Sequence, residues 1–241
     1  MTFESYYSSS TSNLYTVTAA SGRRLLIEAG ATWGQIEKKL GYKLQNVVAC
    51  LCSHEHADHS KAVADVMKAG IDVYASAGTF AAIGINGQRR ARTIEDKTLV
   101  RLDEFEFLAF RTNHDAAEPL GFVVREKLTN EYLLFATDTS HIRQRFNLKF
   151  SIIALEVSYD NEILQKRVDS NDINEAVAKR LVNSHQEKSV AIRYIAEFCE
   201  TSFCREIHLL HTSADNLNIR RTKKRFEQRF PFMDIKIGRK R

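Results

Sequence analysis

The sequence has little proline, few cysteines and no long apolar run. Its 241 residues include only two prolines and four cysteines. No apolar stretch approaches the roughly 20 residues of a membrane-spanning helix, and no basic-apolar leader opens the chain. We therefore expect a cytoplasmic protein without a membrane partner. No internal repeat or low-complexity linker interrupts the chain, so residues 1–241 are expected to form a single domain.

The cysteines argue against both disulfides and a structural zinc site. All four lie in or beside apolar segments, and none forms a paired CxxC motif: Cys50, Cys52, Cys199 and Cys204. We interpret them as reduced core residues. With 44% apolar residues the chain can bury a full hydrophobic core.

Positive charge gathers late in the chain, although the net charge is only +5. The clustered cations are Arg220, Arg221, Lys223, Lys224, Arg225 and Arg229, with Arg239, Lys240 and Arg241 at the end. A basic face suits a polyanionic substrate or partner. An ordinary solvated helix face explains the same pattern equally well.

Strand and helix patterns alternate along the chain, which predicts an α/β fold. Strands are expected at 14–18, 24–28, 47–52, 98–111 (two strands), 121–125, 132–136, 151–157 and 206–210. Helices are expected at 32–40, 60–68 and 190–198, and a last helix begins at Asp215 and Asn216. The composition of the polar stretch 161–182 favours helix. We expect it to cover the site as a lid or to form a subunit contact; a loose surface helix is the alternative.

The stretch 53–60, with the sequence SHEHADHS, follows a buried strand and carries ligands for a divalent metal. His54 and His56 are two residues apart, so in an extended loop both can point to one side. Asp58 and His59 lie at the start of the next helix and aim differently. One pair can serve one ion and the other pair a second ion, as in two-metal hydrolases.

This pattern resembles a known family. The order His54-x-His56-x-Asp58-His59 after a β-strand is similar to the signature of the metallo-β-lactamase fold hydrolases. The details are most similar to the compact branch with ribonuclease Z, the YycJ-type exonucleases and phage-encoded phosphodiesterases of the anti-Pycsar type. The resemblance implies a four-layer αββα sandwich with the site at one edge of its two sheets.

The resemblance also implies the remaining ligands. It places a third ligand of the His54/His56 metal at His114 and the final ligand at His211. Asp138 ends an apolar strand, as a bridging carboxylate requires, and it matches the family's fourth motif. The expected ligand set is therefore His54, His56, Asp58, His59, His114, Asp138 and His211, holding two divalent ions, zinc or manganese.

Further site residues follow from the same resemblance. His185 lies in the loop before helix 190–198 and is similar to the family's catalytic histidine, which we expect to protonate the leaving group; a mere helix cap is the alternative. Ser213 and Asn216 are expected to contact the substrate. Glu28 stands where the family usually has Asp and is expected to contact a metal-binding histidine. His141 and His208 match no ligand position and are expected to be surface or packed residues.

The expected activity is phosphodiester hydrolysis by a metal-bridging hydroxide, with Asp58 and His185 as catalytic residues. The substrate is a cyclic nucleotide or a nucleic acid, and an alternative is a 5′-exonuclease of the YycJ type on DNA or RNA. Ser158 and Tyr159 replace the Asn-His of YycJ-like relatives, which weakens that transfer. A thioesterase of the glyoxalase II type and a non-catalytic nucleotide-binding module are further alternatives. Relatives are often dimeric, so we expect a homodimer.

Overall fold

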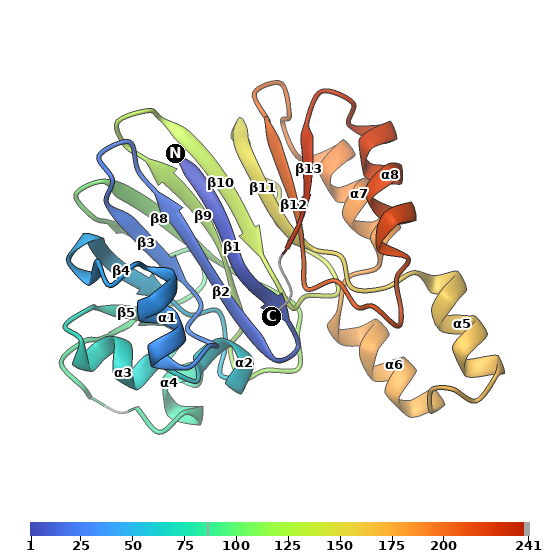
Figure 1. Cartoon of the computed structure of the whole chain (residues 1–241), viewed down its shortest axis with the longest axis horizontal. Helices are drawn as coiled ribbons and strands as arrows, with labels where there is room; N and C mark the ends of the chain where they lie inside the picture. The colour runs from blue at the N-terminus through green and yellow to red at the C-terminus, as the bar shows by residue number, and fades with distance from the viewer. Residues whose placement is uncertain (86, 239–241) are drawn as a thin grey trace. The chain divides into compact units, whose positions relative to one another are not determined.

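The computed structural model describes residues 1–85 and 87–238 (Figure 1). These residues form two compact units. The first unit comprises Met1–Arg111 and Ala116–Glu131, and the second comprises Thr112–Asp115 and Tyr132–Gly238. The three basic residues at 239–241 lie outside the described residues. The single domain expected for 1–241 stays a prediction.

The first unit begins with a six-stranded sheet in the order β1 to β6. Its strands are β1 (Thr2–Ser9), β2 (Ser12–Thr18), β3 (Arg24–Ile27), β4 (Val47–Leu51), β5 (Val73–Ala75) and β6 (Ala91–Thr93). The first three strands are antiparallel, which confirms the predicted hairpin of β2 and β3, and the later pairs are parallel. Strand β1 was not predicted, because its serine-rich end looks like a loop. Ser9 in fact pairs with Ser12, so the turn is only two residues long.

Short helices connect these strands. They are α1 (Trp33–Lys39), the 3₁₀ turn η1 (Leu44–Asn46), α2 (Ala57–Ser60), α3 (Val63–Lys68) and α4 (Ala77–Ala82). Helix α1 confirms the prediction for 32–40, and Thr32 is its N-cap residue. The backbone N–H of Thr32 donates to Gln35 Oε1 at 3.1 Å. The single helix predicted for 60–68 is two helices. The chain breaks there because the Ala62 N–H donates to the carbonyl of Ala29 at 2.8 Å.

Three antiparallel strands complete the first unit. They are β7 (Leu99–Arg101), β8 (Phe105–Arg111) and β9 (Leu120–Glu126). The side chains of Phe105, Phe107 and Phe110 are fully buried, as the sequence predicted for this region. The ring of Phe107 contacts Tyr74 edge-on, with centroids 5.2 Å apart. These aromatic contacts anchor the hairpin in the core.

The second unit is built on four parallel strands. They are β10 (Glu131–Ala136), β11 (Phe150–Glu156), β12 (Glu206–Leu210) and β13 (Asp234–Ile237). Every residue of β11 is buried, as expected for a central parallel strand covered on both faces. The carboxyl ends of neighbouring parallel strands lie at one edge of a sheet. The ends of β10, β11 and β12 therefore bring Asp138, Glu156 and His211 to the same edge.

Four helices complete this unit (Figure 1). They are α5 (Asn161–Asp169), α6 (Glu175–Ser184), α7 (Lys188–Phe198) and α8 (Ile219–Arg229). The polar stretch 161–182 forms the two helices α5 and α6, which meet through Leu164 and Ala178. The last helix begins at Ile219 and not at Asp215, because the side chain of Asn218 accepts the N–H of Arg221 at 3.0 Å and caps the helix there.

The four cysteines are free in the structure. Cys50, Cys52 and Cys204 are buried, and Cys199 is half-buried. Within the described residues, no helix is long and apolar enough to cross a membrane.

Candidate metal centre

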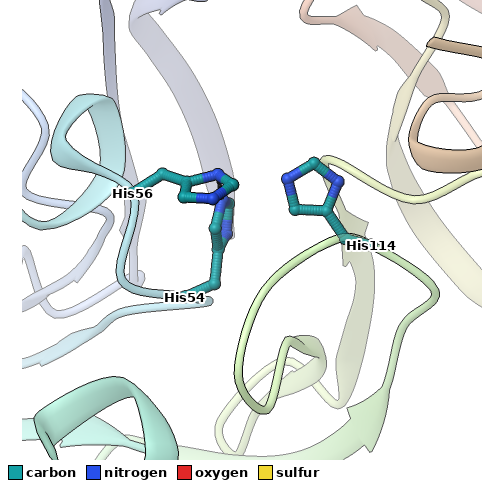
Figure 2. Close-up of side chains that lie close together, drawn as sticks. All are labelled: His54, His56 and His114. Carbon is teal, nitrogen blue, oxygen red and sulfur yellow. Dashed lines mark hydrogen bonds between the residues drawn. The ribbon is translucent and has the colours of Figure 1, made fainter. Parts of the chain in front are cut away.

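A first cluster of imidazoles lies in the first unit, on the loop after β4. His54 Nε2 is 3.1 Å from His56 Nδ1, and the two rings meet edge to face (Figure 2). His54 is buried, and its Nδ1 lies 2.8 Å from Ser53 Oγ. Two imidazole nitrogens that face each other share at most one proton, whereas a cation between them can be bound by both lone pairs.

His59 forms the deep side of this cluster. Its side chain is fully buried, and its ring centroid lies 4.1 Å from that of His54. Its Nε2 is 3.3 Å from Asp58 Oδ2. Asn13, which sequence reasoning did not single out, donates from Nδ2 to Asp58 Oδ2 at 3.2 Å and lies 3.0 Å from His59 Nε2. Tyr15 fixes the amide by donating to Asn13 Oδ1 at 2.9 Å.

Glu28 is a buried carboxylate beside this cluster. Its side chain is fully buried, with Oε1 3.5 Å from His59 Nδ1, and Oε2 accepts the N–H of Ser53 at 3.2 Å. The backbone of Glu28 has a φ of 64°, a left-handed conformation that non-glycine residues seldom adopt. Backbone strain of this kind is typical of functional sites.

The loop that carries His54, His56 and His59, here called the histidine loop, packs closely against Gly30. A Cβ at this position would lie 1.5 Å from the carbonyl oxygen of Asp58. The neighbouring Ala29 donates its N–H to the carbonyl of His59 at 2.8 Å, which clamps the loop against the end of β3. Only glycine therefore permits this approach, and the position of Asp58 and His59 depends on it.

A second cluster gathers in the second unit, at the strand ends described above. One ligand atom from each of Asp138, Glu156, His185 and His211 lies within 4.8 Å of the others. His211 Nδ1 is 2.9 Å from Asp138 Oδ1 and 3.2 Å from Glu156 Oε1. His185 donates from Nδ1 to Glu156 Oε1 at 2.7 Å. The backbones of Asp138 and His211 have φ values of 46° and 48°, so this site too is held in a strained conformation.

The electrostatics of the second cluster favour bound positive charge. Burial lowers the pKa of His211, but the carboxylates of Asp138 and Glu156 raise it overall to about 10. Burial opposes ionisation of Glu156 too, yet the imidazole of His185 holds the pKa of this carboxyl below its usual range. The cluster thus holds protons to balance two buried carboxylates. A divalent cation would supply the same charge, and mixed imidazole and carboxylate ligands suit zinc or manganese.

His114 also belongs to the second unit, on the loop after β8 that Figure 2 draws. Its Nδ1 lies 3.0 Å from the carbonyl of Ser184, and its ring centroid is 5.3 Å from that of His185. Burial lowers the pKa of His114, which favours the neutral form that ligates metals. Arg180 of α6 donates to Asp115 at 2.7 Å and ties the helix to this loop.

His185 follows the end of α6 and does not cap α7. The cap is Glu187, whose carboxylate accepts the N–H groups of Ser189 and Val190. The alternative that His185 caps helix 190–198 is therefore wrong, and His185 is instead the C-cap residue of α6. The His185 side chain is 23% exposed, whereas that of His211 is 8% exposed. His185 is thus the imidazole of this cluster that a substrate reaches most readily.

The remaining sequence candidates have ordinary structural contacts. Asn216 is buried, and its Oδ1 accepts a hydrogen bond from Arg167 of α5. Ser213 is half-buried, and its Oγ lies 3.3 Å from the N–H of Asn216. His208 is buried and contacts Glu206 at 2.9 Å, and the half-buried His141 lies 3.0 Å from a neighbouring serine, in line with the packed or surface roles expected for them.

Glu156, like Asn13, is a site residue that the sequence did not predict. It contacts both His185 and His211, and its Oε2 accepts the N–H of Thr139 at 2.7 Å. The sequence does contain a signal for it, because a carboxylate that ends a predominantly apolar strand has to be paired in the folded protein.

Comparison with known proteins agrees with this fold. The family described as "Beta-lactamase superfamily domain" matches residues 23–177. The metallo-β-lactamase fold protein YhfI from Bacillus subtilis superposes with a TM-score of 0.72 at 14% identity, covering 98% of this chain and 95% of that one. Zinc-bound PqqB from Methylobacterium extorquens gives 0.67 at 13% identity over 95% and 86% of the chains. The short form of human tRNase Z gives 0.62 at 15% identity over 98% and 94%. No curated protein sequence matches.

The family match and the superpositions define the class. The chain belongs to the metallo-β-lactamase superfamily, and its α/β fold is the one predicted from the sequence. At these identities the superpositions show the fold alone, so the activity has to be argued from the two clusters.

Proposed function

We propose that the protein is a metal-dependent phosphodiesterase that hydrolyses nucleotide phosphodiester bonds with two divalent ions, zinc or manganese. The ligands are the seven expected from the sequence: His54, His56, Asp58, His59, His114, Asp138 and His211. The observation that carries the proposal is the second cluster, where two buried carboxylates and two imidazoles meet at the carboxyl edge of parallel strands. When bound, the ions lower the pKa of water and neutralise phosphate oxygens.

His185 is the proton donor in this proposal. Glu156 accepts its Nδ1–H at 2.7 Å, which fixes the tautomer and leaves Nε2 as the nitrogen that can serve a substrate. A ribose oxygen leaves as an alkoxide, a poor leaving group near neutral pH, so a donor at Nε2 assists its departure. Glu156 does not touch the substrate and acts as a positioning residue.

The names of two fold relatives also suit hydrolysis at phosphorus. The superposed proteins include the human tRNase Z and a diphosphatase of the PhnP family, which superposes with a TM-score of 0.61. An exonuclease on DNA or RNA is the second candidate, favoured by the basic surface of α8. Ser213 and Asn216 remain proposed substrate contacts, and α5 and α6 remain the proposed contact of a homodimer.

A substrate panel tests the proposal. The purified protein is assayed on bis-p-nitrophenyl phosphate, cyclic mononucleotides, short RNA and short DNA, each with zinc or manganese. We expect metal-dependent hydrolysis of at least one nucleotide substrate and of the p-nitrophenyl ester. Hydrolysis of a glutathione thioester alone would contradict the proposal and favour the thioesterase.

A further inference from the structure

Helix α8 carries an excess of positive charge that the fold does not use. Its eleven residues contain six cations and one acid, and that acid, Glu227, already lies 3.7 Å from Lys223. The side chains of Arg220, Lys224 and Arg225 are exposed. Among the described residues none forms an ion pair with these three cations. The helix packs through Thr222 and Phe226 on its other face, so the exposed cations serve no packing role.

The spacing of these cations works against the stability of the helix. Arg220 and Lys224 are four residues apart, and so are Arg221 and Arg225, which places like charges next to each other on the surface. Pairs of like charge at this spacing destabilise a helix. An anionic ligand would neutralise the repulsion, and several adjacent cations match several phosphates better than one.

An exposed aromatic residue follows the basic helix. The side chain of Phe232 is 95% exposed, two residues beyond Phe230, whose ring lies under the guanidinium of Arg229 at 5.5 Å. A fully exposed phenyl ring loses the free energy of burial and offers a flat apolar face. Nucleic-acid bases stack on such faces, and this stacking accompanies cationic grooves in proteins that bind single strands.

The helix also leads away from the second cluster. It connects the parallel strands β12 and β13, packs against β13 and therefore runs antiparallel to them (Figure 1). Its N-terminus accordingly lies at the strand edge that carries His211, and Phe232 lies at the opposite end. The helix is about 16 Å long. This length is enough to contact several phosphates of a nucleic-acid strand that extends from the sheet edge with the second cluster.

We propose that the exposed face of α8, together with Phe232, binds the phosphate backbone and a base of single-stranded nucleic acid. This inference deepens the proposed function, because it names a polynucleotide as the substrate class. A cyclic mononucleotide carries about one charge and cannot contact the whole row of cations.

Binding to the metal-free full-length protein tests the inference without any turnover. The protein is treated with a chelator, its fold is checked by circular dichroism, and fluorescence anisotropy measures the Kd for labelled oligo-uridine of about 12 nucleotides. The Kd is measured between about 50 and 200 mM NaCl. For the triple variant Arg220→Gln, Lys224→Gln, Arg225→Gln we expect at least about 10-fold weaker binding and a salt slope smaller by about two, since each contact contributes about 0.7.

Matched variants separate this surface from general charge and hydrophobicity. Lys38→Gln, Lys43→Gln, Arg89→Gln removes the same charge from exposed sites in the first unit and should leave Kd and salt slope unchanged. Phe232→Ser should weaken binding about 5- to 100-fold without changing the slope. Leu128→Ser, at another exposed apolar residue, should have no effect. Equal weakening in the two triple variants would overturn the assignment to α8.

Other probes distinguish competing partners. Tighter binding of duplex DNA with no effect of Phe232→Ser would overturn the single-strand assignment, and binding of phosphatidylserine vesicles without oligonucleotide binding would overturn the whole inference. Hydrolysis of bis-p-nitrophenyl phosphate by the wild type is measured in parallel. A protein that binds the oligonucleotide but hydrolyses nothing refutes the proposed function alone. A protein that hydrolyses the ester but has no salt-dependent oligonucleotide binding refutes this inference alone.

Discussion

His185 and Glu156 form the closest imidazole–carboxylate contact of the second cluster, with Nδ1 and Oε1 2.7 Å apart. The same oxygen lies 3.2 Å from His211 Nδ1, so one buried carboxylate orients two imidazoles. His185 is the more exposed of the two. The arrangement separates a ring that can move a proton from a ring that can hold a metal.

Replacement of His185 should depend on the leaving group. For His185→Ala we expect a rate loss of about 10²- to 10⁴-fold on substrates that expel a ribose oxygen, since the alkoxide leaves without a proton. The loss on p-nitrophenyl esters should be much smaller, because that leaving group needs little protonation. The measurement is kcat on both substrates, together with metal content. Equal losses on both, or loss of an ion, would refute the proton-donor role.

Replacement of Glu156 should act through His185. We expect Glu156→Gln to lower kcat on a ribonucleotide substrate by about 10- to 100-fold, in the range found for residues that orient functional histidines. The KM should change little, and the pH profile of kcat should shift because the imidazole loses its carboxylate partner. Glu197→Gln, at an exposed position of α7, is the matched control. A variant that keeps the wild-type pH profile would show that Glu156 does not position His185.

A methyl group at position 30 should dislodge the histidine loop. For Gly30→Ala we expect a loss of about 1–3 kcal/mol in the free energy of unfolding, because the Cβ would overlap the Asp58 carbonyl. Metal content should fall as well. The control is Gly34→Ala in α1, where a Cβ meets no atom within 4 Å and alanine favours the helix. Urea unfolding measures both variants, and equal stability of the two would contradict this view of Gly30.

Glu206 should make the protein more stable above pH 4.5 than near pH 2. Its carboxylate lies 2.9 Å from His208 Nε2 and 3.0 Å from Lys236 Nζ, and these contacts lower the pKa of Glu206 to about 2. A depressed pKa in the folded state stabilises the protein above the unfolded pKa of about 4.3, and this stability is lost as pH falls toward 2. The side chain is 19% exposed, so screening reduces the effect to about 1–2 kcal/mol.

The variant Glu206→Gln tests this by urea unfolding at several pH values. The wild type should lose stability between pH 4.5 and 2 relative to the variant. Parallel curves for the two proteins across this range would show that Glu206 does not contribute.

The sequence predicted the strands that carry the site better than the strands at the sheet edges. Strand β4 is a continuous apolar run, and β11 is apolar apart from Ser151 and the terminal Glu156, so the pattern of both strands is unambiguous. Strands β1 and β13 were missed because β1 is rich in serine, β13 has only four residues, and both lie at the ends of their sheets. At an edge, pairing to one neighbour decides the structure, and sequence patterns do not contain that partner.

Contacts between single residues also limit how much of the candidate site can be predicted from the sequence. The histidines could be found because a cluster of imidazoles is rare, but the roles of Glu156 and Asn13 depend on which side chains lie opposite in the fold. Neither residue stands within ten positions of the histidines that it contacts. The positive φ values at Glu28, Asp138 and His211 are likewise a product of the surrounding structure.

The metal content of the protein tests the central claim most directly. Elemental analysis of wild-type protein, purified without chelator, should find close to two zinc or manganese ions per chain, with fewer in His56→Ala and Asp58→Ala, which should also lose turnover because each lacks a ligand. Wild-type protein that carries no transition metal and gains no activity when zinc or manganese is added would contradict the account.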